Sequence, residues 1–362
     1  MTSLFQGRVR PIPPARWVRS RLLASPLDVA LTVCVLVAGL VAVPPLLDWL
    51  VFSATVVADP ALDRPADACR GTNGACWVFV GEWWRFLLFG RYPLAEQWRP
   101  MLVVAGCLTL IALSCRRGAW RPWLAVVWAF GLSAGIILMA GGVFGLTPVP
   151  SRDWGGLPLT LGLSLIGLAV GLPLGILLAL GRHFGRPPVS SVCAGAIETV
   201  RGIPLIALLF FAGLVVPFLL PPDLTPSLVV RAQIAVIVFA AAYASEVVRG
   251  GLQAIPAGQI DAARALGCTW SQAIARVVLP QALRLSLPPM VNTGVGIIKD
   301  TALVGAIGLA DVVESARAAL TNPDWLGFYR EAYVFVGLVY FALCFTLARY
   351  ARRLERRDQR PG

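Results

Sequence analysis

Long runs of apolar positions alternate with short polar segments along this chain. A helix of about 20 apolar residues is long enough to cross the hydrocarbon core of a bilayer. The runs predict an all-α integral membrane protein with about eight transmembrane helices, at 27–50, 100–115, 123–145, 157–180, 203–221, 228–248, 288–310 and 331–350. The first run exceeds the core of a cleavable signal peptide, which indicates an uncleaved anchor.

Composition supports the membrane assignment. Hydrophobic residues make up 57% of the 362 residues and charged residues only 14%, whereas soluble domains carry about 25% charged residues. The net charge is +12, but the arginines gather at the ends of apolar runs. That placement is typical of a polytopic membrane protein, not of a nucleic-acid-binding surface.

The positive-inside rule predicts the topology. Five segments rich in arginine alternate with the other loops, so we expect them on the cytoplasmic face with both termini. These segments are 1–26, 116–122, 181–187, 249–285 and 351–362. The opposite loop, 53–99, balances its arginines with acidic residues, as expected for a periplasmic loop.

The sequence offers no catalytic, metal or cofactor site. The only lysine, Lys299, is not part of a phosphate-binding loop, and the only histidine is His183. One histidine cannot build a zinc site or a catalytic triad. We therefore expect no enzyme activity in this chain.

Two cysteines, Cys69 and Cys76, lie in the outer loop on either side of a Gly-Thr-Asn-Gly stretch. A turn there would bring their sulfurs together, and an oxidising periplasm favours a disulfide. Two unpaired thiols are the alternative.

Glycines recur at four-residue spacing in two apolar runs. Gly167, Gly171 and Gly175 share one helix face, and Gly131 and Gly135 share another. Small residues at this spacing let two membrane helices approach closely, so we interpret both faces as packing surfaces within the subunit.

The segment 246–285 is too polar to lie in the bilayer. Residues 259–266 favour a helix, Gly267 favours its end, and Thr269 to Gln272 matches a capping box for a second helix. Pro280 is expected to disturb the end of that second helix. The segment therefore predicts a helix, a glycine turn and a helix, projecting from the membrane. An amphipathic pair lying on the lipid headgroups is the alternative.

This segment resembles the EAA motif of the permease subunits of bacterial ABC importers. The positions that carry the resemblance are Asp261, Ala262, Ala263, Gly267, Val277, Leu279 and Pro280. Asp261 stands where the motif has Glu, and Val277 where it has Ile. The stretches that begin at Glu246 and at Glu198 resemble the polar amino-acid branch. The resemblance covers 157–350.

The N-terminal spans and the stretch from Lys299 resemble one of the two permeases of general L-amino-acid importers. The resemblance implies a five-helix type I permease core at 157–350, after three extra helices within 27–150. It implies a coupling loop at 246–285 that docks a cytoplasmic ATPase dimer, and the ATPase subunits hold the ATP and Mg²⁺. It also implies a second related permease, or a second copy of this chain, and a periplasmic amino-acid-binding protein. The resemblance therefore implies that this chain is part of a bacterial inner-membrane importer of L-amino acids. A stand-alone carrier or channel is the alternative.

Ionisable residues inside a span cost a few kcal/mol and usually mark function. The candidates for a substrate path are Glu198, Arg201, Asn292, Thr293, Lys299 and Asp300. An amino acid carries an ammonium and a carboxylate, so a site of both signs fits it. Structural roles are the alternative, with Glu198 and Arg201 as an internal ion pair.

Overall fold

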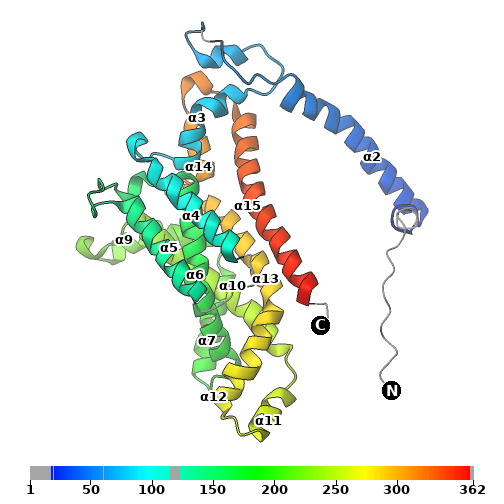
Figure 1. Cartoon of the computed structure of the whole chain (residues 1–362), viewed down its shortest axis with the longest axis vertical. Coiled ribbons are helices and arrows are strands. Elements are labelled where there is room, and N and C mark those ends of the chain that lie inside the picture. The colour runs from blue at the N-terminus through cyan, green and yellow to red at the C-terminus, as the bar shows by residue number, and fades with distance from the viewer. Residues whose placement is uncertain (1–17, 19, 60, 115–122, 359–362) are drawn as a thin grey trace. The chain divides into compact units, whose positions relative to one another are not determined.

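A computed structural model describes residues 18, 20–59, 61–114 and 123–358 (Figure 1). Most of the N-terminal basic segment, the 116–122 loop and the last residues lie outside this part, so their predicted orientation stays a prediction. The described part is helical, and its β-structure is limited to an isolated bridge between Thr55 and Cys76. This confirms the all-α fold class.

The helices follow one another with few long connections. The first half of the chain contains α2 (Pro26–Leu47), η1 (Asp48–Phe52), η2 (Pro65–Cys69), α3 (Trp77–Phe89), η3 (Leu94–Glu96), α4 (Trp98–Ser114), α5 (Trp123–Ala140), η5 (Ser151–Asp153) and α6 (Gly156–Phe184). The second half contains α7 (Val189–Gly202), α8 (Leu205–Phe210), η6 (Phe211–Val215), α9 (Val216–Leu219), η7 (Pro222–Leu224), α10 (Leu228–Gln253), α11 (Gly258–Ala265), α12 (Trp270–Ala273), η8 (Ile274–Val278), α13 (Leu279–Asp300), η9 (Thr301–Ile307), α14 (Val312–Ala319), η10 (Pro323–Trp325) and α15 (Tyr329–Asp358).

The chain folds as two compact units, 1–81 and 82–362. In the first unit, Ser25 caps α2 by accepting a hydrogen bond from the backbone N–H of Asp28 at 3.1 Å. Cys69 and Cys76 are joined by a disulfide with their Cα atoms 5.7 Å apart. The second unit holds α4 and α5 together with all later helices. The functional division near residue 150 stays a prediction.

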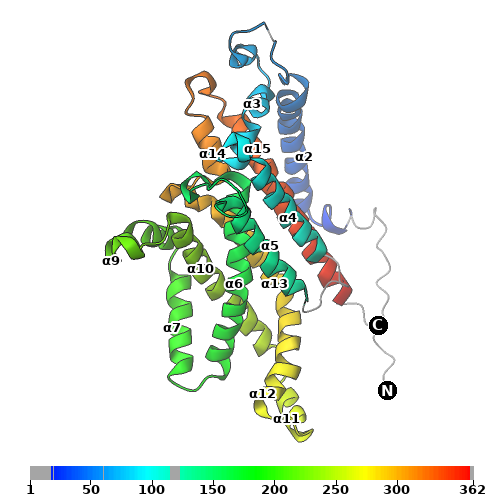
Figure 2. The same ribbon diagram turned by 60° about the vertical axis from the view of Figure 1, so that its left-hand side comes forward.

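The glycine faces predicted from the sequence bring helices into close contact in the second unit. A Cβ atom at Gly171 would lie 2.7 Å from the Cβ of Ala240, and one at Gly175 would lie 2.8 Å from the Cβ of Ala244. The packing interpretation is thus confirmed for α6, which lies along α10 (Figure 2). Gly131 of α5 approaches Leu110 of α4 in the same way.

Six helical stretches are long and apolar enough to cross a membrane, counted over the described residues. They are Pro26–Phe52, Trp123–Ala140, Gly156–Phe184, Leu228–Gln253, Trp270–Ile307 and Tyr329–Arg349. A seventh is the pair Val189–Gly202 and Leu205–Leu219, which is bent by 99°. The fold is therefore multi-pass, but the predicted count of eight is not confirmed, because α4 is a shorter apolar helix.

The bent pair replaces the single crossing expected at 203–221. The helix begins earlier, at Val189, and stops at Gly202 before Pro204. A residue before proline is pushed away from helical geometry, and Ile203 accordingly adopts extended φ and ψ angles of −105° and 129°. Pro204 therefore interrupts the helix just after Gly202.

Two apolar clusters hold the second unit together. The larger one joins α6, α8, α10, α13 and η9 around buried residues such as Leu209 and Val236. The smaller one joins the ends of α6 and α10 to η8 and α13 through Ala179, Val248 and Val278. The smaller cluster supports the polar segment between α10 and α13.

Candidate functional site

The polar segment between α10 and α13 forms a helical projection at one end of the second unit. α11 and α12 lie at this end in both views, and α14 lies at the other end (Figures 1 and 2). The first predicted helix, 259–266, matches α11, Gly258–Ala265. The helix–glycine–helix prediction for the loop is therefore confirmed in its first half.

Gly267 ends α11 with a left-handed backbone, at a φ angle of +87°. Its N–H donates to the carbonyl of Arg264 at 3.0 Å, and the N–H of Cys268 donates to the carbonyl of Ala263 at 3.1 Å. This pattern satisfies carbonyls that a helix C-terminus otherwise leaves unpaired. No atom lies within 4 Å of a Cβ built at Gly267, so the need for glycine is conformational, not steric.

Thr269 starts the second helix of the loop with a complete capping box. The Thr269 hydroxyl accepts a hydrogen bond from the N–H of Gln272 at 3.3 Å, and the Gln272 side chain accepts one from the N–H of Thr269 at 3.0 Å. The predicted box is confirmed. The end of α11 and the start of α12 are thus both satisfied by local hydrogen bonds on either side of Gly267.

Pro280 follows a local departure from regular α-helix, as expected, but it does not end the second helix. α12 continues through the π-helical turn η8 into α13, and Pro280 lies in the first turn of α13. Because the helix is continuous here, the N–H that Pro280 lacks would otherwise bond to the preceding turn, and the π turn η8 lies just before it. In the π turn, the backbone N–H of Leu279 donates to the carbonyl of Ile274. The side-chain amide of Gln281 donates to the carbonyl of Val277 at 2.8 Å.

The motif positions divide into exposed and packed residues. Asp261, Ala262 and Pro280 are exposed, Gly267 is exposed at the turn, and Val277 and Leu279 are half-buried. Ala263 is buried, and its neighbour Ile260 packs against the smaller apolar cluster. One side of α11 is thus anchored to α6, α10 and α13, while Asp261 and Ala262 face outward.

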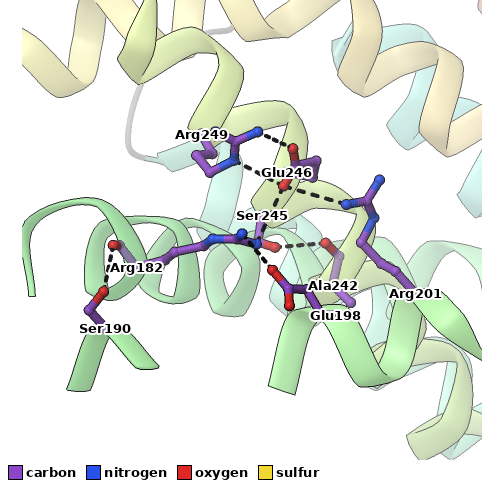
Figure 3. A network of polar contacts seen from close by, with 8 residues as sticks. All are labelled: Arg182, Ser190, Glu198, Arg201, Ala242, Ser245, Glu246 and Arg249. Atoms are coloured by element: carbon purple, nitrogen blue, oxygen red, sulfur yellow. Dashed lines mark hydrogen bonds and ion pairs between the residues drawn. The ribbon is translucent and has the colours of Figure 1, made fainter. Parts of the chain in front are cut away.

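A network of five charged side chains joins α6, α7 and α10 (Figure 3). The guanidinium of Arg182 donates to the carboxylate of Glu198 at 2.7 Å. The carboxylate of Glu246 accepts two hydrogen bonds from Arg249, one of them 3.0 Å long. The same carboxylate lies 3.5 Å from Arg201 and 3.8 Å from Arg182. Three arginines against two glutamates leave the network with an excess positive charge.

The predicted pair Glu198 and Arg201 joins this network, but its members do not bond to one another. Glu198 bonds to α6 and Arg201 faces α10. Sequence reasoning placed Arg182 in a loop and missed it as a site residue, although it lies within α6. The usable signal was Glu246, the only acidic residue of α10.

The other four predicted path residues lie on α13 and outside the network. Asn292 and Lys299 are exposed, while Thr293 and Asp300 are half-buried. The hydroxyl of Thr293 donates to the carbonyl of Pro289 at 3.1 Å within the helix. The structure thus does not gather the six candidates into one site.

Gly251 is a further residue that sequence reasoning missed. A Cβ there would lie 2.5 Å from the carbonyl of Ala282 and would also overlap the Ser286 hydroxyl. α10 and α13 therefore meet closely at the two ends of loop 246–285. The Gly250-Gly251 pair was the available signal.

Polar contacts also order the end of this unit that carries α14. Asp311 is fully buried and caps α14, accepting from the N–H groups of Val313 and Glu314 and from the Tyr340 hydroxyl. Burial raises the pKa of Asp311 to about 6.

Beside α4, the hydrogen bond from Thr147 together with Arg99 lowers the pKa of Glu96. In the described part, no cluster of His, Cys, Asp and Glu could hold a metal ion.

Comparison with known proteins agrees with this architecture. Residues 171–358 match the family described as binding-protein-dependent transport system inner membrane component. The chain is 39% identical over 348 residues to the inner membrane amino-acid ABC transporter permease protein YhdY of Escherichia coli (strain K12), covering 94% of this chain and 92% of that protein.

A second relative is similar over nearly its whole length. It is the glutamate/glutamine/aspartate/asparagine transport system permease protein BztC of Rhodobacter capsulatus, with 34% identity over 423 residues, 99% of this chain and 98% of that protein. A solved structure described as an amino acid ABC transporter with histidines matches 55% of this chain and 90% of that chain, with 28% identity and a TM-score of 0.49.

The fold is that of a multi-pass helical membrane protein with a capped helical loop at one end of its second unit. The chain belongs to the family of binding-protein-dependent transport system inner membrane components, the permeases of ABC importers. Membership confirms the resemblance stated from the motif and implies an inner-membrane location, an ATPase partner and a substrate-binding protein. The relatives are transport subunits and not enzymes, and the stand-alone carrier is not favoured.

Proposed function

We propose that this permease imports L-amino acids from the periplasm and that loop 246–285 couples it to its ATPase. The relatives named above carry amino-acid and glutamate, glutamine, aspartate or asparagine transport in their names. Polar amino acids are therefore the expected cargo, and L-glutamine is a suitable test substrate.

The observation that carries the coupling role is the division of α11 into an anchored and an exposed side. Ala263 and Ile260 connect α11 to the cluster at the ends of α6, α10 and α13. Asp261 and Ala262 stay free for a partner. A stiff helix pair fixed to membrane helices transmits a push from a docked subunit, whereas a flexible loop would absorb it.

The partners follow from the same arrangement. A cytoplasmic ATPase dimer docks on α11 and holds the ATP and Mg²⁺, since this chain is expected to bind neither. A second related permease, or a second copy of this chain, completes the transport path. Exposed charged side chains on spanning helices, such as Glu198 and Lys299, support such a partner, because charged groups do not face lipid without cost.

The orientation is part of the proposal. Arg182, Arg249, Arg264 and Arg276 belong to the ends of α6 and α10 and to the loop, which the positive-inside rule assigns to the cytoplasm. Both termini are then cytoplasmic. The disulfide between Cys69 and Cys76 lies in the predicted periplasmic loop, where an oxidising environment would preserve it.

Affinity purification of tagged protein from native membranes in mild detergent tests the coupling role. We expect the ATPase subunit to co-purify with the wild type and to be lost from Asp261→Lys, which reverses the exposed charge of α11. Asp223→Lys is the matched control, because Asp223 is an exposed acid in η7, outside the loop.

Uptake of L-[14C]glutamine into proteoliposomes with the ATPase and binding protein is the second readout. We expect Asp261→Lys to abolish ATP-dependent uptake while membrane insertion stays normal. Retention of the ATPase and of uptake in Asp261→Lys would remove this residue from the coupling role. If no ATPase subunit co-purifies with the wild type, the proposal that loop 246–285 couples this permease to an ATPase is contradicted as a whole.

A further inference from the structure

The second half of loop 246–285 contains one irregular helical turn. α12 passes into α13 through η8, where the backbone N–H of Leu279 donates to the carbonyl of Ile274, five residues earlier instead of four. Pro280 follows at once and has no N–H to donate. Single π turns within helices are rare and are frequently found at functional sites. The regular bonding of this continuous helix is thus interrupted between Ile274 and Pro280.

Gln281 connects this irregular turn to α11. Its side-chain amide donates to the carbonyl of Val277 at 2.8 Å, within the turn. The same nitrogen lies 3.5 Å from the side-chain oxygen of Gln259 in α11. An amide NH2 group has two N–H donors, so one side chain can serve both acceptors. Gln281 therefore links the helix that carries Asp261 to the turn through which α12 enters α13.

α13 is packed against α10 directly after the turn. Ala282 and Ser286 are buried, and a Cβ atom at Gly251 would lie 2.5 Å from the carbonyl of Ala282. The Ser286 hydroxyl donates to the carbonyl of Val247 at 3.2 Å. The irregular turn thus lies between a segment held on α10 and the part of the loop that carries α11 and α12.

Apolar packing holds the inner side of the same turn. Val278 is buried in the smaller apolar cluster, and Ile260 of α11 packs against that cluster. Ala275 and Arg276, also in the turn, are exposed. Apolar burial has no directional requirement, so it does not by itself favour a π turn over an α turn. The hydrogen bond from Gln281 is directional and fixes the position of the Val277 carbonyl.

We propose that Gln281 is a positioning residue of the coupling loop, which holds the turn at η8 and ties it to α11. Displacement of α11 by a docked ATPase is then passed to η8 through Gln259 and Gln281. It changes the direction of α13 at the one turn of this helix whose regular bonding is interrupted. The proposal rests on the coupling role proposed for loop 246–285.

Uptake of L-[14C]glutamine per ATP hydrolysed tests this role, in proteoliposomes that contain the permease–ATPase complex and the binding protein. Gln281→Met keeps the length of the side chain but removes its donor. A neutral hydrogen bond shifts an equilibrium by about twofold to tenfold, so uptake per ATP is expected to fall by about this factor. Co-purification of the ATPase should remain, because Asp261 and Ala262 stay exposed on α11.

Hydrogen exchange of the backbone amides of 274–279 in the same complex is the second readout, because it reports on the turn itself. Exchange should rise by about twofold to tenfold in Gln281→Met. Gln259→Met removes only the contact with α11, so exchange should stay at the wild-type rate while uptake per ATP falls. Gln281→Lys keeps an N–H donor and should restore part of both values.

Gln233→Met is the matched control. Gln233 lies in α10 outside the loop, and its side-chain amide donates to the carbonyl of Leu163 at 3.2 Å. This substitution removes the same kind of hydrogen bond elsewhere in the second unit. It therefore reports the effect of lost stability alone, and uptake per ATP should stay at the wild-type value.

Three results would overturn the proposal. The first is wild-type uptake per ATP and wild-type exchange in Gln281→Met. The second is an equal fall of uptake per ATP in Gln281→Met and Gln233→Met. The third is loss of the ATPase from Gln281→Met, which would make Gln281 a docking contact. Full uptake by Asp261→Lys would instead count against the coupling role of the loop, and the exchange of 274–279 would still decide whether Gln281 holds the turn.

Discussion

The carboxylate of Glu246 on α10 lies 3.5 Å from the guanidinium of Arg201 on α7, while also accepting hydrogen bonds from Arg249. Glu246 thus connects guanidinium groups of α7 and α10 within the second unit. Because its side chain is only 25% exposed, water does not fully replace these contacts when they are lost.

Glu246→Gln is expected to destabilise the protein. The substitution leaves three arginines facing Glu198 alone, so their mutual repulsion rises. The free-energy cost of breaking a partly buried ion pair lies between the costs for exposed and for fully buried pairs. We therefore expect the free energy of unfolding to fall by about 1–2 kcal/mol. Thermal unfolding of the purified permease in detergent measures this. Glu314→Gln is the control, because Glu314 pairs with Arg317 of its own helix at 3.8 Å. Equal effects of the two variants would contradict the central role of Glu246.

Gly267→Ala is expected to weaken the coupling loop. A left-handed backbone costs a residue with a Cβ atom roughly 1–2 kcal/mol, and Gly267 has a φ angle of +87°. Gly267→Asn should cost less, since asparagine tolerates this conformation. ATP-driven uptake per ATP hydrolysed is the measurement. Gly258→Ala serves as control, because Gly258 lies in α11 with open space around it. Uptake that falls equally in Gly267→Ala and Gly258→Ala would exclude the conformational explanation.

The loop was predictable because its signals are local. Gly267 and the capping box of Thr269 and Gln272 act over a few residues, and both adopt the expected geometry. The interruption at Pro204 is local for the same reason. The continuation of the second helix through Pro280 was missed, because the π turn that accommodates the proline has no comparable sequence signal.

The charged network was predictable only in part. Glu198 and Arg201 were identified as charges within apolar sequence, but the i,i+3 rule favoured a bond between them. The actual partner of Glu198 is 16 residues away, on another helix. Which helices approach one another depends on packing such as that of Gly171 and Gly175 against α10. The sequence shows the face of small residues on α6, but it does not show which helix packs against that face.

Gly171→Leu is expected to disrupt the packing of α6 against α10. Even a Cβ atom at this position would lie 2.7 Å from the Cβ of Ala240 and 3.1 Å from the N atom of Ala241. Overpacking a close contact costs about 1–3 kcal/mol for a few added methylenes, and a whole leucine adds more. The yield of monodisperse protein by size-exclusion chromatography checks this. Gly162→Leu is the matched control on the same helix, where no atom lies within 4 Å of a Cβ. Normal yield of Gly171→Leu would refute the close approach.

Asp311 is expected to make stability depend on pH. Burial raises its pKa from 3.8 to about 6, so the folded state holds this proton in a window where the unfolded state has lost it. Stability contributed by the neutral acid is therefore complete below about pH 4 and falls as the pH rises through 6. A shift of this size corresponds to roughly 3 kcal/mol. Asp311→Asn keeps an acceptor for the α14 cap but cannot ionise.

Thermal unfolding of wild type and Asp311→Asn between pH 4.5 and pH 7.5 measures this dependence. The wild type is expected to lose stability across the interval, and the variant should lose less. Asp223→Asn controls for removal of an exposed acid and should follow the wild type. The Tyr340 hydroxyl lies 3.1 Å from Asp311 and can turn to accept from the asparagine amide, so the contact between the α14 cap and α15 persists. Parallel pH profiles of wild type and Asp311→Asn would show that the buried carboxyl does not titrate in this range.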